Sequence, residues 1–288
     1  MIDFADYLRQ QAGRVNDRLD ELLPGPDERP ESVHQAMRYS VFAGGKRIRP
    51  ILTLATAEMV GGQEKDVLDP ACALEMIHTY SLIHDDLPCM DDDDIRRGKP
   101  TLHKAFPEGI AVLAGDALHA LAFEILASTA PSSLVKEVAG AIGSQGMIGG
   151  QTVDLESEGR KLLPEEIEFI HRHKTGMLIT TALRAGAICA QAGETSLDAV
   201  TRYGQCIGLA FQIIDDILDV EGNAEMLGKQ TGMDIHRQKA TYPSVFGLED
   251  SKDQAVKLIA EAKEFLVPFG PDARRLYQMA DFIVQRVR

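Results

Sequence analysis

Acidic side chains recur at helical spacing near residue 215. Gln212, Asp215, Asp216 and Asp219 stand at positions i, i+3, i+4 and i+7, which places them on one stripe of a helix. The surrounding residues are apolar, so this helix has too little polar surface to lie on the outside of a fold. Carboxylates on such a face repel one another and lose solvation. A hard divalent cation offsets that repulsion, and ligation by oxygen alone favours Mg2+.

A second acidic run spans residues 85–94, with an Asp pair at its start and four consecutive aspartates at its end. It follows an apolar segment of helical periodicity, and the proline inside the run predicts that the helix ends or kinks there. Alone, such a run is typical of a solvated loop. However, Arg96 and Arg97 come directly behind it, and proteins usually hold Mg2+ with one or two carboxylates plus substrate phosphates. Carboxylates beside arginines predict a site for a metal-bound diphosphate.

A compact cationic segment, GGKRIRP at residues 44–50, lies in an otherwise acidic chain. Its glycines permit close approach to a ligand, and its lysine and arginines supply donors for phosphate. Taken alone, the segment fits a turn with solvated charges equally well. His78 lies seven residues before Asp85, hence on roughly the same helical face two turns away. Facing a metal–diphosphate site, it is placed to donate to a second phosphate.

Helical periodicity positions these groups. Apolar residues recur at three- and four-residue spacing in segments 74–82 and 110–121, and segment 209–214 is apolar nearly all round. Alternating Val/Ile/Thr runs are few, and no Asn-Gly or Asp-Gly pair suggests a hairpin. Glycine and proline breaks separate segments long enough to span a domain core. We therefore expect an all-α fold, one large bundle of roughly ten or more helices, with residues 1–288 forming a single domain.

Composition narrows the class of protein. A formal charge of −14 argues against a nucleic-acid binder or a ligand of anionic membranes, because those partners need a basic face. We find no basic and apolar leader at the start, and no run of apolar residues that approaches a membrane span. The four cysteines are scattered without a CxxC pair, which is typical of thiols in a reducing compartment. A cytoplasmic location is therefore expected.

Taken together, these segments resemble the trans-isoprenyl diphosphate synthases, and among them the bacterial farnesyl diphosphate synthases. The matching motifs occur in the family's order, cover most of the chain and show no departure in a motif residue. They are GGKRIRP (44–50), SLIHDDLPCMDDDDIRRGKPTLH (81–103), LAGDAL (113–118), GGQTVDL (149–155), IHRHKTG (170–176), GLAFQIIDDILDV (208–220), LGKQTGMD (227–234) and KATYP (239–243).

The resemblance implies a bundle around a central cavity, a homodimer, and a role for each motif residue. The residues that resemble the metal-binding ones, for several Mg2+ ions, are Asp85, Asp86, Asp91, Asp215, Asp216 and Asp219. With the exception of Asp219, the same aspartates are expected to act in catalysis together with Arg96, Lys174 and Lys229. The expected allylic diphosphate site comprises Arg96, Lys174, Thr175, Gln212, Lys229 and Lys239. The expected isopentenyl diphosphate site, which needs no metal, comprises Gly45, Lys46, Arg49, His78 and Arg97. The basic end, residues 285–288, resembles a C-terminus that helps to close the site.

The implied reaction is a Mg2+-dependent head-to-tail condensation. Isopentenyl diphosphate adds to dimethylallyl and then geranyl diphosphate, by ionisation, condensation and elimination, to give farnesyl diphosphate. Ionisation needs stabilisation of the leaving diphosphate, and the carbocation needs a site that excludes water.

Product length is expected to depend on Tyr80 and Ser81, which lie five and four residues before Asp85. A helical rise places them about 6–8 Å deeper along the axis. If the prenyl tail runs down this helix, Tyr80 is a bulky floor. In the family, an aromatic residue at this fifth position, with the longer first motif, accompanies a C15 product. Geranylgeranyl and geranyl diphosphate remain the alternative products.

Three other readings remain open. A terpene cyclase shares the helical bundle and one Asp motif, but does not need the cations of residues 44–50. An HD-type metal phosphohydrolase is suggested by His84-Asp85, yet leaves the cluster near residue 215 unexplained. A non-catalytic partner subunit is expected to carry degraded Asp motifs, whereas both are intact here.

Overall fold

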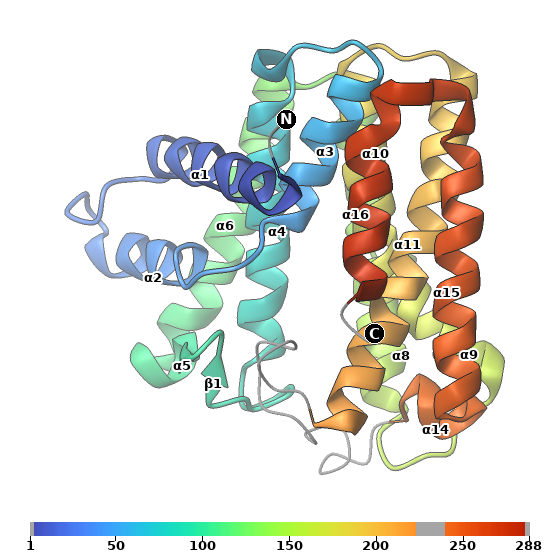
Figure 1. Cartoon of the computed structure of the whole chain (residues 1–288). Coiled ribbons are helices and arrows are strands. Elements are labelled where there is room, and N and C mark those ends of the chain that lie inside the picture. Colours follow the sequence, from blue (N-terminus) through green and yellow to red (C-terminus); the bar gives the residue numbers. More distant parts are fainter. Residues whose placement is uncertain (1–2, 223–239, 286–288) are drawn as a thin grey trace.

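The structure, a computed structural model, describes residues 3–222 and 240–285 of the 288-residue chain. These residues are almost entirely helical, which confirms the predicted fold class (Figure 1). The longer helices are α1 (Phe4–Leu22), α2 (Glu31–Val41), α3 (Ile48–Met59), α4 (Leu68–Asp85), α6 (Glu108–Thr129), α7 (Ser132–Ile142), α8 (Met147–Glu156), α10 (Met177–Cys189), α11 (Glu194–Glu221), α15 (Leu248–Phe265) and α16 (Arg274–Val284). The shorter ones are η1 (Glu64–Asp66), α5 (Leu102–Ala105), α9 (Pro164–Ile170), η2 (His171–Gly176), α14 (Tyr242–Phe246) and η3 (Val267–Ala273).

The breaks predicted from glycine and proline fall at helix ends. Pro131 precedes α7, and Pro164 is the first residue of α9, where the missing N–H costs nothing. Helix α4 ends at Asp85, three residues before Pro88. Gly222 ends α11 in the left-handed conformation that glycine adopts readily.

One small feature departs from the purely helical expectation. Strands β1 (Ile95–Arg96) and β2 (Lys99–Pro100) form an antiparallel hairpin. Arg97 and Gly98 between them both have positive φ, 54° and 74°, as a two-residue type I′ turn requires. An Arg-Gly pair is not one of the Asn-Gly and Asp-Gly pairs that typically predict such a turn.

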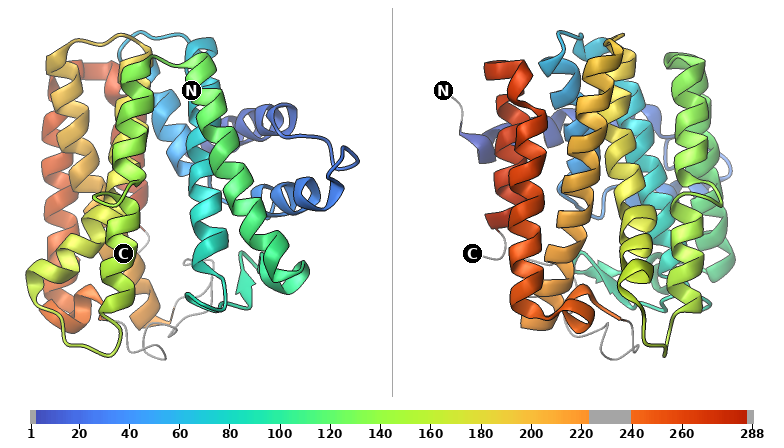
Figure 2. Two further views of the ribbon diagram at one scale, coloured as in Figure 1. Left: turned by 180° about the vertical axis from the view of Figure 1, so that it is seen from behind. Right: turned by 90° about the vertical axis from the view of Figure 1, so that its right-hand side faces the viewer.

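Helices α4 and α11 position the two acidic clusters. Both run the length of the bundle, and their C-terminal ends lie at the same end of the molecule (Figures 1 and 2). Helix α4 is buried from Pro70 to Ile77 and packs against α6 and α3, whereas α11 packs against α15 and α10. Both helices are largely apolar where they are buried, and each carries an acidic cluster at its C-terminal end.

Helix α6 is, among the residues described, the one helix long and apolar enough to cross a membrane by length and composition. It packs against α4, α2 and α5. Core helices of soluble proteins pass the same test, so this helix is weak evidence for a membrane span.

Candidate functional site

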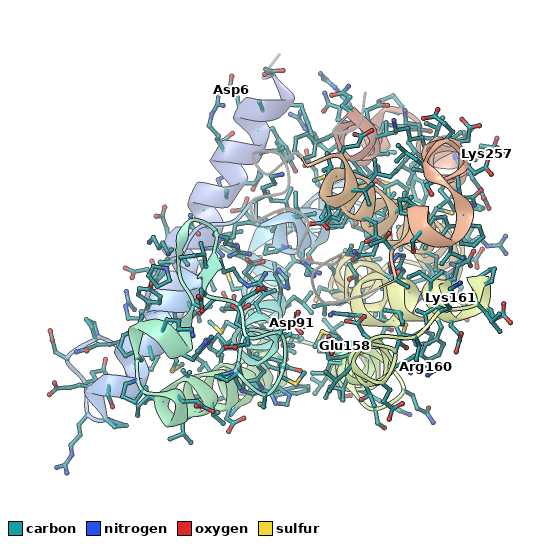
Figure 3. All side chains as sticks on the ribbon, turned by 90° about the horizontal axis from the view of Figure 1, so that it is seen from below. Asp6, Asp91, Glu158, Arg160, Lys161 and Lys257 are labelled. Carbon is teal, nitrogen blue, oxygen red and sulfur yellow. The ribbon has the colours of Figure 1, made fainter. Side chains whose placement is uncertain are left out.

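The first acidic cluster folds back on the end of α4. The Asp91 N–H donates to the Asp85 carbonyl at 2.8 Å, which closes the turn after the helix and brings Asp91 beside Asp85. Seen from below, Asp91 lies near the centre of the molecule, whereas Asp6 and Lys257 lie at its edge (Figure 3). Asp85 and Asp91 are partly buried after this helix end, whereas Asp92 and Asp94 of the same run are exposed.

Arg96 pairs with Asp86. Its Nε donates to both carboxylate oxygens, at 2.7 and 2.8 Å, from the hairpin behind the cluster. Burial raises the pKa of Asp86 to about 6, against the opposing effect of Arg96. Although burial disfavours its charge, the hydrogen bonds and charge of Asp86 raise the pKa of Arg96 above its usual value. Arg96 thus fixes the orientation of a buried carboxylate.

Lys174 joins the first cluster from η2. Its Nζ lies 2.7 Å from Asp154 Oδ2 of α8 and 3.7 Å from Asp85 Oδ1. Gln151 of α8 also donates to Asp85 Oδ1, at 2.5 Å. Despite burial, Asp85, Asp154 and Asp91 raise the pKa of Lys174 above its usual value. The positive charge of the Lys174 ammonium therefore already lies beside these carboxylates.

The second cluster lies on the last turns of α11, as the spacing predicted, but its members are not equivalent. Asp216 Oδ2 accepts from the Tyr242 N–H at 2.7 Å and lies 3.0 Å from His171 Nε2. Its Oδ1 accepts from Gln212 at 3.2 Å. Both oxygens of Asp216 therefore accept hydrogen bonds within the protein, and the metal role expected for it stays a prediction. A stripe on a helical wheel does not show which member meets the neighbouring helix.

The π-helical turn η2 connects the two clusters. Lys174 contacts Asp85 on the α4 side, and the next residue, Thr175, donates to Gln212 of α11 at 2.8 Å. A π-helical turn inserts one extra residue per turn, and such turns are frequent at functional sites. Neighbouring residues of one short segment thus reach both acidic groups. The predicted Lys229 and Lys239 lie outside the described residues.

The donor set fits the predicted metal. Asp85, Asp91, Asp215 and Asp219 offer carboxylate oxygens, and no cysteine is among them. Oxygen ligands of this kind suit a hard divalent cation such as Mg2+. The position of Lys174 is a second observation in favour, because a positive group already lies between Asp85 and Asp154.

A separate group of cations lies beside the first cluster. The Arg97 guanidinium donates to the Gly44 carbonyl and lies 2.7 Å from where a Cβ on Gly45 would be, so a side chain there would collide with it. Burial lowers the pKa of Arg49 to about 10, with a contribution from Arg97. Burial and the charges of Arg49 and Arg97 hold the pKa of His78 well below its usual value. Arg49 and Arg97 are thus partly buried cations, and His78 beside them is held toward its neutral form, a set of donors that suits an anion.

Lys46 is the exposed member of the same segment. Its ammonium lies 5.8 Å from the centre of the Phe282 ring on α16. The segment predicted to bind isopentenyl diphosphate therefore meets the C-terminal helix as well as α4.

Tyr80 is buried one turn above the cluster and closes the space between α4 and α6. Its ring stacks on His119 of α6 at 4.7 Å between ring centres, and His119 meets the Phe123 ring edge-on at 5.2 Å. Burial raises the pKa of Tyr80 to about 12. The neighbouring Ser81 donates to the His78 carbonyl at 2.8 Å within its own helix. A tail that ran down α4 from Asp85 would pass the level of Ser81 first and would then meet the Tyr80–His119 pair.

Several residues of the site were missed by sequence reasoning. Gln151 and Asp154 lie three residues apart in the GGQTVDL motif, and that helical spacing was the available signal. His119 gave no signal, because its contact with Tyr80 joins two helices that are distant in sequence.

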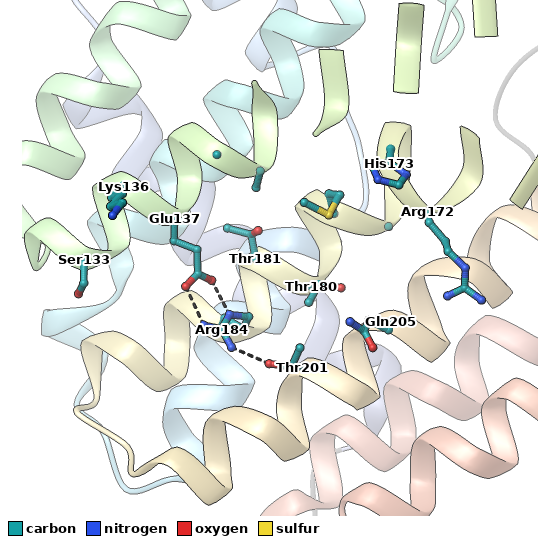
Figure 4. A pocket seen from close by; sticks show the side chains of 14 residues that line it. Ser133, Lys136, Glu137, Arg172, His173, Thr180, Thr181, Arg184, Thr201 and Gln205 are labelled. Carbon is teal, nitrogen blue, oxygen red and sulfur yellow. Dashed lines mark hydrogen bonds and ion pairs between the residues drawn. The ribbon is translucent and has the colours of Figure 1, made fainter. Parts of the chain in front are cut away.

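A cavity of about 790 Å3 lies between α7, α10 and α11, away from the aspartates (Figure 4). Arg172 and His173 of η2 line it, whereas Lys174 and Thr175 contact the acidic groups. Its polar centre is the pair Arg184–Glu137, which makes two hydrogen bonds at 2.5 and 2.8 Å.

The family follows from comparison with known proteins. The chain belongs to the polyprenyl synthetase family, whose model matches residues 30–265. It is therefore a trans-prenyltransferase, and its substrates as a class are isopentenyl and allylic diphosphates. This assignment replaces the readings as a terpene cyclase and as an HD-type phosphohydrolase.

Curated relatives are named for the C20 product. The chain is 47% identical to a heterodimeric geranylgeranyl pyrophosphate synthase large subunit of Arabidopsis thaliana, covering 99% of this chain and 80% of that protein. It is 49% identical to a geranylgeranyl diphosphate synthase of Cyanophora paradoxa, covering 97% and 95%.

Solved structures point to shorter and longer products. An FPP/GFPP synthase of Zymomonas mobilis is 40% identical, with a TM-score of 0.87 and 98% of both chains covered. A putative farnesyl-diphosphate synthase of Marinomonas sp. is 38% identical, with a TM-score of 0.84, covering 99% of this chain and 100% of that one.

Proposed function

We propose that this enzyme makes farnesyl diphosphate by Mg2+-dependent condensation of isopentenyl diphosphate with dimethylallyl and geranyl diphosphate. The observation that carries the chemistry is η2, where Lys174 contacts the first acidic cluster and Thr175 the helix of the second. The observation that carries the chain length is the Tyr80–His119 stack. Geranylgeranyl diphosphate is the second candidate product, favoured by the names of the relatives.

The allylic diphosphate binds between the two acidic clusters. Mg2+, when bound by Asp85, Asp91, Asp215 and Asp219, supplies positive charge for the leaving diphosphate. Lys174 adds a fixed cation at the same place, and its contacts with Asp85 and Asp154 hold it ready before the substrate arrives. Arg96 holds Asp86 in one orientation. The allylic C–O bond then breaks in a site where the charge of the diphosphate is compensated.

Isopentenyl diphosphate binds to side chains alone. Arg49 and Arg97 supply two positive charges without a metal ligand between them, and His78 adds a neutral N–H donor, so an anion relieves the repulsion of the arginines. Its double bond attacks C1 of the allylic cation, and a proton is then lost to the departing diphosphate. Two diphosphate subsites of different chemistry keep the two substrates in different places.

The Tyr80 floor supports a C15 product. Each condensation adds five carbons, and the chain grows along α4 until it meets the buried ring. His119 and Phe123 stand behind that ring, so it has little room to move.

Analysis of the products tests both parts of the proposal. The enzyme is incubated with dimethylallyl and isopentenyl diphosphates and Mg2+, and the dephosphorylated products are separated by chromatography. We expect farnesol as the main product. Geranylgeraniol as the main product would show that the stack does not end elongation, and no prenyl alcohol beyond C5 would overturn the condensation itself.

Removing the floor gives the matching variant. Tyr80→Ala is expected to shift the main product from C15 to C20, because the tail can then pass the position of the ring. Ser128→Ala near the end of α6 is the control, because this serine is exposed and its hydroxyl donates to the Glu124 carbonyl of its own helix. An unchanged product from Tyr80→Ala would assign the floor to another residue.

We further propose a homodimer. Some relatives are named as large subunits of heterodimeric synthases, which supports association within this fold. Light scattering on the protein eluted from a size-exclusion column is expected to give twice the chain mass of 31.5 kDa, and a mass equal to that of one chain would contradict the homodimer.

A further inference from the structure

Of the two arginines of GGKRIRP, Arg47 has the smaller exposed surface. Its side chain is 2% exposed, although the sequence places it between Lys46 and Arg49, in a segment expected to bind phosphate. Its φ of 51° lies in the left-handed region, which is costly for a residue with a side chain. The structure around it must therefore hold this conformation.

Every nitrogen of the Arg47 guanidinium is used within the protein. Nε donates to Asn16 of α1 at 2.9 Å, and Nη2 donates to the Val41 carbonyl at the end of α2 at 2.6 Å. Nη1 donates to Glu75 of α4 at 2.8 Å. Arg47, the residue just before α3, is thus tied to three other helices, and each of its three side-chain nitrogens donates to an acceptor within the protein.

Glu75 is the acidic half of this pair and is also 2% exposed. It lies three residues before His78, on the same face of α4. Burial lowers the pKa values of Arg49 and Arg97, and the negative charge of Glu75 opposes that shift for both. Glu75 is therefore the counter-charge for a group of buried cations and not for Arg47 alone.

The turn that precedes Arg47 is held from its other side by Arg97. Gly44 and Gly45 have φ values of 110° and 126°, and the Gly44 carbonyl accepts from Arg97. The backbone that carries Lys46 is therefore fixed between Arg97 on one side and the Arg47–Glu75 pair on the other. A change in the pair would move the turn and the cations together.

We propose that the buried Arg47–Glu75 pair positions the cations of the metal-free subsite and thereby sets the affinity for isopentenyl diphosphate. The proposal rests on the proposed function of that subsite. Both are positioning residues, since neither reaches the substrate. The allylic subsite depends on different residues, Asp85, Asp154 and Lys174, and is expected to be unaffected.

The test is Glu75→Gln, which keeps the size of the side chain and an oxygen for Arg47 but removes the charge. We expect the KM for isopentenyl diphosphate to rise tenfold or more, with the KM for geranyl diphosphate within twofold of the wild type. A purely structural role would lower the yield of active enzyme and the melting temperature while leaving both KM values unchanged. That second pattern would overturn the proposal.

The Arg184–Glu137 pair supplies a matched control. It has the same chemistry, joins α7 to α10, and lies in the cavity away from the aspartates (Figure 4). Glu137→Gln is expected to lower the melting temperature without changing either KM. If Glu137→Gln raised the KM for isopentenyl diphosphate as much as Glu75→Gln does, the effect would be general and the proposal would be wrong.

Calorimetric titration separates this proposal from the function on which it rests. Isopentenyl diphosphate is added in EDTA to the wild type, to Glu75→Gln and to the double variant Arg47→Met/Glu75→Leu. The double variant keeps the pair's volume with apolar side chains, which often preserves stability. No binding by the wild type refutes the proposed subsite. Binding by the wild type and tenfold weaker binding by both variants supports the positioning role, and equal binding by all three overturns it.

Discussion

At the scale of single residues, the two acidic clusters contain carboxylates with different duties. The helical spacing identified Asp215, Asp216 and Asp219 as one face of a helix, whatever the tertiary structure, but it missed Asp154 of α8. It could not separate Asp216 from Asp215, since the difference comes from Tyr242 and His171, which lie far away in the sequence. Whether a carboxylate is held within the protein or is open to a ligand therefore depends on the residues that pack around it.

Two substitutions at this scale should give opposite patterns. Asp85→Asn removes a site carboxylate at the end of α4 and is expected to cut turnover by about 10²-fold or more, the scale of losing a preorganised electrostatic contact. Its unfolding free energy should stay near that of the wild type. Asp216→Asn leaves the Tyr242 N–H and His171 with poorer partners and is expected to cost about 1–3 kcal/mol of stability. Steady-state kinetics and urea unfolding of both variants make the comparison, and equal stability of the two would contradict it.

His78 gives a prediction about pH. Burial and the nearby arginines lower its folded-state pKa below the unfolded value of 6.5, so the unfolded chain takes up a proton that the folded one does not. Above pH 6.5 His78 is neutral in both states and does not affect the free energy of unfolding. Below pH 6.5 the proton taken up by the unfolded chain lowers that free energy, by up to about 1.4 kcal/mol per pH unit. Urea unfolding at several pH values should show a shallower acid decline for His78→Asn than for the wild type. Parallel declines would mean that His78 does not carry the effect.

At the scale of elements, helix periodicity and punctuation predicted most of what positions the site. The ends of α4 and α11 follow from Pro88 and Gly222, and these ends place both clusters. The sequence did not reveal η2, because HRHKTG continues the pattern of an ordinary helix and the extra residue per turn shows only in the backbone. Glycines that touch η2 explain how it fits. A Cβ on Gly150 would lie 2.3 Å from the Lys174 backbone nitrogen, and one on Gly208 would lie 2.9 Å from the Gly176 Cα.

Gly150→Ala tests the role of η2. The added methyl must push away the backbone that carries Lys174, so turnover is expected to fall at least tenfold. Gly140→Ala on α7 is the matched control, because its Cβ would meet nothing within 4 Å. That control should keep full activity and gain about 0.5–1 kcal/mol of stability, as Gly-to-Ala changes in helices do. Normal turnover in Gly150→Ala would show that the position of η2 is not critical.

At the scale of the whole molecule, the proposed enzyme has two diphosphate subsites at one end of a helical bundle, and only one of them uses a metal ion. We propose that one is built from carboxylates that hold a divalent cation, and the other from Arg49, Arg97 and the N–H donor of His78, which need only an anion. An acidic chain with a formal charge of −14 handles anionic substrates because its cations are concentrated beside the aspartates.

Equilibrium binding with and without Mg2+ tests this central claim most directly. Isopentenyl diphosphate and an unreactive thio analogue of geranyl diphosphate are each titrated into the wild-type enzyme, once in EDTA and once in Mg2+. The account predicts that the Kd for isopentenyl diphosphate changes by less than twofold, while the analogue binds at least a hundredfold more weakly without Mg2+. Equal dependence of both ligands on Mg2+, or independence of both, would contradict it.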